Sequence, residues 1–212
     1  MTDQEFLVNY WRNYILLEKE YFGTEQYVAL DTDNYSTFSA NFGKLLLQIG
    51  SEVDIEAKML CNLLQGKTPS CIVDYKAIIT QSFPEFTNIN VTVLNRTLSF
   101  QPWIEWKTDN SPTWWKSYNG YKHNRLQIEN GRPNYKNANL KNIIFSLGGL
   151  YQLEIYTYYE LTSRNNQANL PMPGSRLFRL NGDKWDQMNF PQDISLSVDN
   201  GTLSILTSVF QY

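Results

Sequence analysis

The longest helical pattern in the chain covers residues 34–65, with the sequence NYSTFSANFGKLLLQIGSEVDIEAKMLCNLLQ. Its apolar side chains recur at steps of three and four residues and hold one face for about eight turns. Asn34 or Ser36 can cap the start of this helix, and Gly66 can end it. A helix of this length is typical of a helical bundle. The apolar face comprises Phe38, Phe42, Leu45, Leu46, Ile49, Val53, Ala57, Leu60, Cys61 and Leu64.

Glycines interrupt this helix and one later helix. Gly43 and Gly50 each cost up to about 1 kcal/mol relative to alanine in a helix interior. Their presence therefore predicts either a kink or a close contact with another helix. Gly148 and Gly149 stand inside a second apolar helix, where close packing explains them better than a phosphate-binding loop.

Further periodic or alternating segments complete a mainly α fold. Helices are expected over residues 4–21, 72–83, 113–125 and 135–162. Short extended segments are expected at 91–94, 175–180 and 194–206, the last as a β-hairpin around Asp199-Asn200-Gly201. Residues 1–164 are therefore predicted to form a helical bundle. Residues 165–212 are predicted to form an extended or β appendage.

Composition limits the classes of function. The chain has 212 residues, a net charge of -3 and 15% aromatic residues, which suits a packed core and gives no overall basic footprint. Cys61 and Cys71 match no metal-ligand spacing, so we expect reduced thiols, no metal and no cofactor. Neither a signal peptide nor a run of about 20 apolar residues is apparent, which favours the cytoplasm and no membrane partner.

The chemically distinctive segment runs from Trp114 to Arg125 and contains His123, the single histidine of the chain. On a helix, Trp115, Asn119 and His123 are four residues apart and share a face. Lys116 and Lys122 flank that face. This spacing places an amide, an imidazole and two ammonium groups beside a large aromatic ring.

The same segment begins a basic region in an acidic protein. Residues 114–141 hold six lysine and arginine residues against Glu129 alone, a local charge of +5. Such a region indicates an anionic partner, most often phosphate. Histidine titrates near neutral pH, so it can exchange protons or, when charged, stabilise phosphoryl oxygens.

Structural explanations compete with this hypothesis. Asn119 and His123 could form a buried polar network between helices, and the adjacent tryptophans could be core anchors. The cations could be a solvated face that balances Glu52, Asp54 and Glu56 of the long helix. Metal catalysis is not expected from a single histidine without carboxylates at ligand spacing.

The order of elements across residues 34–162, with Asn119 and His123 on a short helix before a closing apolar helix, resembles HEPN domains. These are helical bundles of bacterial phage-defence and toxin–antitoxin systems and of CRISPR effectors. The family's ribonuclease motif is an arginine and a histidine separated by four to six residues, often with asparagine directly after the arginine. Here Tyr118 stands in the place of the arginine.

The resemblance implies a homodimer that cleaves RNA without metal, with His123 as acid or base near the 2'-hydroxyl and Asn119 beside it. Because the arginine is missing, Lys122 or Arg125 would stabilise the phosphate. Lys116, Tyr118 and Trp115 would complete the substrate-binding surface. Alternatively, the chain is a non-catalytic relative that binds RNA or nucleotide, a helical scaffold or regulatory subunit that binds a protein partner, or a purely structural protein.

Overall fold

The computed structural model describes residues 1–212 except 130, 165–168, 183, 187–194, 200–201 and 207–212. The protein is mainly helical, with a small antiparallel sheet, as the sequence predicts. In the described part of the chain, no helix combines the length and apolar character needed to cross a bilayer. The α-helices are α1 (Asp3–Phe6), α2 (Arg12–Glu25), α3 (Ala40–Gln65), α4 (Ile72–Ser82), α5 (Thr113–His123) and α6 (Leu140–Ser163).

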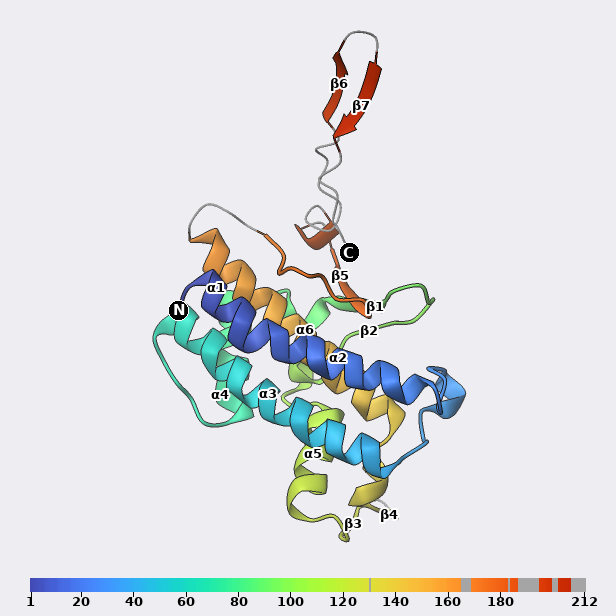
Figure 1. Cartoon of the computed structure of the whole chain (residues 1–212). Helices are drawn as coiled ribbons and strands as arrows, with labels where there is room; N and C mark the ends of the chain where they lie inside the picture. The colour runs from blue at the N-terminus through green and yellow to red at the C-terminus, as the bar shows by residue number, and fades with distance from the viewer. Residues whose placement is uncertain (130, 165–168, 183, 187–194, 200–201, 207–212) are drawn as a thin grey trace.

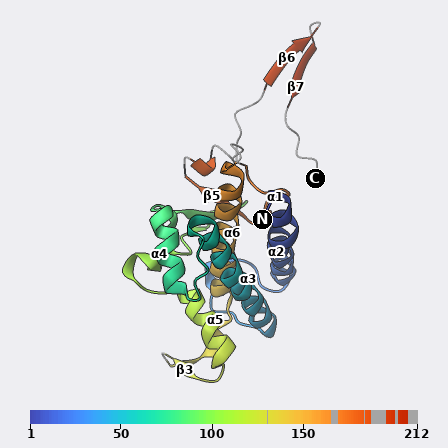
Figure 2. The same ribbon diagram turned by 90° about the vertical axis from the view of Figure 1, so that its left-hand side faces the viewer.

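The centre of the molecule is the pair α3 and α6, which pack against each other (Figure 1). Helices α1 and α2 cover one side of this pair and α4 the other, while α5 lies across one end (Figure 2). The contact is apolar: Leu46, Ile49 and Val53 of α3 and Leu147 and Leu150 of α6 are fully buried. Removing these side chains from water supplies the main driving force for assembling the bundle.

Helix α3 begins six residues later than the sequence pattern predicts. Ser39, in extended conformation, caps it by accepting a hydrogen bond from the Phe42 amide at 3.1 Å. The preceding residues instead form a short 3-10 turn, η2 (Thr32–Asn34). Phe38 was expected on the apolar helix face, but it precedes the helix and its side chain is 41% exposed. The end at Gly66 is as predicted, because this residue adopts φ 67°.

The first and last long helices also differ from their expected bounds. A capping box formed by Thr2 and Glu5 starts the first one. It then contains a π-helical turn, η1 (Leu7–Trp11), before α2 continues to Glu25. The last helix starts at Leu140 rather than 135, because a 3-10 turn, η5 (Asn134–Asn137), precedes its Asn139 cap.

The glycines of α3 are close-contact sites, one of the two outcomes expected for them. A Cβ atom added at Gly50 would overlap the ring of Tyr118, and one added at Gly43 would overlap the hydroxyl end of Tyr121. Both tyrosines belong to α5. The absence of side chains on α3 therefore lets α5 approach its backbone.

A three-stranded antiparallel sheet covers part of α6. Strand β1 (Asn90–Val93) lies between β2 (Ser99–Phe100) and β5 (Phe178–Asn181), with Val91 opposite both Phe100 and Leu180. The extended segments predicted near residues 91–94 and 175–180 thus pair with each other. The chain before β5 is fixed by Glu18 of α2, whose buried carboxylate accepts hydrogen bonds from the Arg176 and Leu177 amides.

Two hairpins complete the described structure. Strands β3 (Ile128–Glu129) and β4 (Arg132–Pro133) form a short hairpin after α5. Strands β6 (Ser195–Asp199) and β7 (Thr202–Leu206) pair in antiparallel fashion where the sequence predicts a hairpin. The Asn200 and Gly201 turn of that prediction lies outside the described residues.

Candidate functional site

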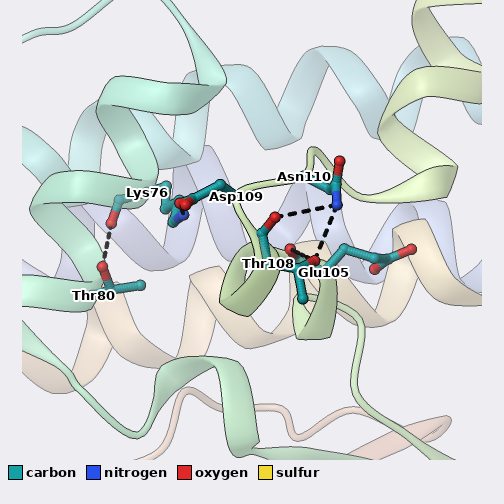
Figure 3. A network of polar contacts seen from close by, with 6 residues as sticks. All are labelled: Lys76, Thr80, Glu105, Thr108, Asp109 and Asn110. Carbon is teal, nitrogen blue, oxygen red and sulfur yellow. Dashed lines mark hydrogen bonds and ion pairs between the residues drawn. The ribbon is translucent and has the colours of Figure 1, made fainter.

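A network of polar contacts lies in the turn that precedes α5, and Lys76 of α4 takes part in it (Figure 3). The first residue of α5 follows Pro112, which has no side-chain oxygen to cap the helix. Glu105, in the 3-10 turn η4 (Ile104–Thr108), supplies that acceptor: its carboxylate binds the Thr113 amide at 3.1 Å and the Thr113 hydroxyl at 2.8 Å. The ion pair between Lys76 of α4 and Asp109 ties the same turn to the bundle.

The aromatic residues of α5 face the core. Trp114 is buried edge-on against Trp103, and its indole N–H donates to the Pro102 carbonyl at 2.8 Å. Trp115 and Tyr118, both candidates for substrate binding, are only 8% and 4% exposed. The tryptophans are therefore core anchors, and these two rings position the helix rather than face a ligand.

His123 is the last residue of α5 and lies exposed to solvent. No hydrogen bond to its imidazole is formed by any residue that the structure describes. Asn119 is half-buried and donates to the Trp115 carbonyl within its own helix at 3.1 Å. The alternative of a buried Asn119–His123 network between helices is therefore not observed.

Two cationic side chains near the end of α5 contact tyrosines of the same helix. The Lys122 ammonium donates to the Tyr118 hydroxyl at 3.1 Å. The Arg125 guanidinium lies 4.5 Å from the centroid of the Tyr121 ring. Both side chains are exposed, as is Lys116 earlier in the helix. These contacts limit their rotation while the charges remain available to an anion.

An exposed aromatic ring lies beside two further cations, Arg132 and Lys136, and the sequence pattern did not reveal it. Phe38 forms an isolated bridge with Asn139, and the Arg132 guanidinium donates to the nearby Ser36 carbonyl at 3.1 Å. The Arg132 guanidinium is 5.9 Å and the Lys136 ammonium 5.7 Å from the centroid of the Phe38 ring. Tyr135, 38% exposed, meets the same ring edge-on at 5.8 Å.

Backbone contacts join this ring to the end of α5. The Tyr135 amide donates to the Arg125 carbonyl at 2.9 Å, and the buried Asn134 side chain donates to the Asn124 carbonyl at 3.1 Å. The β3–β4 hairpin between them lies at the same end of the molecule as α5 (Figure 1). We call this surface the basic end, defined by Phe38, Lys122, His123, Arg125, Arg132, Tyr135 and Lys136.

The acidic residues of α3 form no ion pair with the basic end in the part of the chain that the structure describes. Asp54 pairs with Lys58 on its own helix. Glu56 is 1% exposed, and neither of its carboxylate oxygens has a hydrogen-bond partner in the described structure. Burial raises the pKa of Glu56 to about 8, and burial and then the charge of Glu56 raise that of Glu154 on α6. The alternative in which Glu56 balances a solvated face of basic residues is therefore not supported, because its carboxylate is buried.

No group of three or more histidine, cysteine, aspartate or glutamate side chains in the described residues is placed to bind a metal ion. Comparisons with protein-family models, with curated proteins and with solved structures find no significant match to this chain. The function of the basic end therefore has to be inferred from its own side chains.

Proposed function

We propose that this chain is an HEPN-like, RNA-binding protein of a bacterial defence or toxin–antitoxin system, and that the basic end binds single-stranded RNA. The observation that carries the proposal is the exposed Phe38 ring, with Arg132 and Lys136 both within 6 Å of its centroid. A ring at the protein surface with cations at its margin offers partners for both a base and its phosphate.

The cations supply the sequence-independent part of such binding. Lys122, Arg125, Arg132 and Lys136 are connected through the contacts described above, and none forms an ion pair with a described carboxylate. Each phosphate that they neutralise would release counterions, so affinity should fall steeply with salt. The opposing charge nearby is Glu129, which accepts a hydrogen bond from Asn134 at 3.3 Å.

The aromatic rings favour a single strand over a duplex. A base stacks on an exposed ring only when it is not already stacked within a helix. Stacking contributes about 1–3 kcal/mol per base and tolerates any sequence. Phe38 and Tyr135 are the rings of the basic end that are exposed enough to serve in this way.

Metal-independent RNA cleavage by a homodimer is the second candidate. It is favoured by the exposure of His123, together with Leu126 and Ile128, which are 83% and 68% exposed just beyond it. Apolar side chains this exposed suit a two-fold contact, which would bring two copies of His123 together beside Arg125 and Lys122. In this arrangement His123 would act as acid or base and Asn119 would remain a positioning residue.

Fluorescence anisotropy with a labelled single-stranded RNA tests the binding proposal. The double variant Lys122→Glu/Arg125→Glu should weaken binding about tenfold or more at low salt and flatten its salt dependence. A matched control, Lys19→Glu/Lys67→Glu, makes the same change of charge on α2 and beyond the end of α3, and should retain most of the affinity. Equal losses in both variants would refute a localised site.

Cleavage is tested separately with His123→Ala. If the chain is a nuclease, this variant should bind the RNA normally but fail to cut it, with an unchanged melting temperature because His123 is exposed. Light scattering of Leu126→Ser/Ile128→Ser should then show a loss of dimer. Binding without cleavage in the unmodified protein would leave the non-catalytic form of the proposal.

A further inference from the structure

A lysine ammonium is surrounded by aromatic rings at the end of α6, away from the basic end. The Lys184 ammonium lies 3.3 Å from the centroid of the Tyr159 ring and 4.5 Å from that of Trp185. The rings of Phe83 and Tyr156 are 5.5 and 5.6 Å away. Cation–π attraction acts within about 6 Å of a ring centroid, so all four rings can contribute.

The rings support one another and are fixed by the bundle. Tyr156 packs against Phe83 at 4.8 Å and against Trp185 at 4.8 Å. Tyr159 meets Trp185 edge-on at 5.6 Å. Tyr156 and Trp185 are fully buried, and the Tyr156 hydroxyl donates to Glu85 at 3.2 Å. The rings therefore form a built enclosure, which we call the aromatic cage: Phe83, Tyr156, Tyr159 and Trp185.

Lysine is an imperfect occupant of this cage. Its ammonium has three N–H donors. No hydrogen bond or ion pair to the Lys184 ammonium is formed by the described residues, and the nearby Glu160 carboxylate is held by Arg164 at 2.9 Å. Partial burial between the rings lowers the pKa of Lys184, although the charges of Glu85 and Glu160 oppose this effect. Lys184 is half-buried, and the side of its ammonium that faces the rings meets no hydrogen-bond acceptor among the described residues, whereas a cation without N–H groups needs none.

We propose that the aromatic cage is a binding site for a methylated ammonium group, and that Lys184 occupies it as an internal plug. Rings with cation-sized spacing and a carboxylate at the margin are the chemistry that recognises quaternary ammonium ions. Occupation by Lys184 also holds the chain after β5 against α6. The site is independent of RNA binding at the basic end.

Removing the plug provides the test, with tetramethylammonium as the probe. In Lys184→Ala, the methyl proton signal of the probe should move upfield, because the rings shield it, and should titrate to saturation. The unmodified protein should bind the probe at least ten times more weakly. Lys184→Met, which refills the cage with a neutral chain of similar length, should also bind weakly. In Lys184→Ala/Tyr159→Leu the binding should be lost, and Tyr159 is half-buried, so the fold should tolerate this change.

Two results would overturn the proposal. One is an unchanged probe signal in Lys184→Ala whose near-ultraviolet circular dichroism is native. The other is equal binding of the neutral, similarly sized tert-butanol, which would show an apolar hollow with no preference for charge.

A second measurement does not depend on the alanine variant. Reductive methylation of the whole protein with labelled formaldehyde converts its lysines to dimethyl-lysines. The N-methyl signal of Lys184 is identified as the one that is missing from the spectrum of Lys184→Arg. This signal should lie upfield of the other N-methyl signals and should titrate at a lower pH than they do. A signal at the ordinary position would place the modified group outside the cage and would refute the proposal.

Discussion

The two halves of α3 meet their neighbours in different ways. In the first half, Gly43 and Gly50 expose the helix backbone to Tyr121 and Tyr118 of α5. In the second half, Glu56 carries a carboxylate into the interior, where its negative charge and that of Glu154 oppose each other. The contact between α3 and α5 depends on the absence of side-chain atoms at the two glycines. The contact between Glu56 and Glu154 depends on a proton that neutralises at least one of the two carboxylates.

The contacts that hold α5, and with it the basic end, are therefore different from the buried carboxylates, whose charge depends on pH. Close packing of rings on glycine depends on shape and is insensitive to pH. Two buried carboxylates without a cation are tolerated only when at least one is protonated. The helix that carries His123 is therefore attached to the half of α3 that depends on close packing and not on a buried carboxylate.

The largest effect is expected from Gly50→Ala. The added methyl group would overlap the Tyr118 ring, which is buried, so the ring or the helix must shift. We expect the free energy of unfolding to fall by about 3 kcal/mol, the upper part of the range for overpacked cores. Urea denaturation would measure this change.

Two other glycines provide controls for that measurement. Gly23→Ala changes the same residue type in α2, where nothing lies within 4 Å of the new Cβ, and should stabilise the protein by about 0.5 kcal/mol. Gly43→Ala should cost less than Gly50→Ala, because the overlapping Tyr121 hydroxyl belongs to a half-buried side chain. Equal costs at positions 43 and 50 would contradict the difference described here.

An intermediate effect, which grows as pH rises above about 4.5, is expected from Glu56→Gln. The folded-state pKa of Glu56 is raised from 4.5 to about 8 because burial penalises the charged form. The contribution of this protonated group to the free energy of unfolding is fully present below about pH 4.5 and is lost as pH rises through about 8. The neutral amide should match the parent near pH 4.5 and become progressively more stable than the parent as the pH rises from 4.5 to 8.

Thermal unfolding across that pH range checks this prediction. Glu20→Gln, on the exposed surface of α2, makes the same chemical change in solvent and should leave the pH profile unaltered. Parallel profiles for the parent and Glu56→Gln would show that a partner satisfies the Glu56 carboxylate in solution. The contrast between the two halves of α3 would then fail.

Much of the helical architecture could be predicted from sequence, because it depends on local periodicity and end signals. Gly66 ended α3 as expected, and the close approach at Gly43 and Gly50 followed from the cost of glycine in a helix. The start of α3 was misplaced because Phe38 fits the apolar period by chance, whereas Ser39 decides the cap. The pairing of β1 with β5 joins distant segments, and no local pattern encodes it.

The candidate site was predictable only in part. The basic residues around His123 were apparent from charge and spacing. Phe38 lies 85 residues before His123 in the chain, and its ring approaches Arg132 only through tertiary contacts. The burial of Glu56 was not anticipated, because Glu52, Asp54 and Glu56 were considered together as acids that could balance the basic residues. Which carboxylate faces solvent depends on the position of α6.

The smallest effect is expected at the polar anchor of α5, from Glu105→Ala. Without its carboxylate, the Thr113 amide loses its acceptor at the start of a helix that Pro112 cannot cap. Removal of such a cap costs about 1 kcal/mol. Hydrogen exchange should become faster at the first amides of α5 while those of α3 are unchanged. Glu105→Gln retains an acceptor oxygen and should recover part of the loss. Identical exchange rates in the parent and in both variants would instead show that the tyrosine contacts with α3 alone position α5.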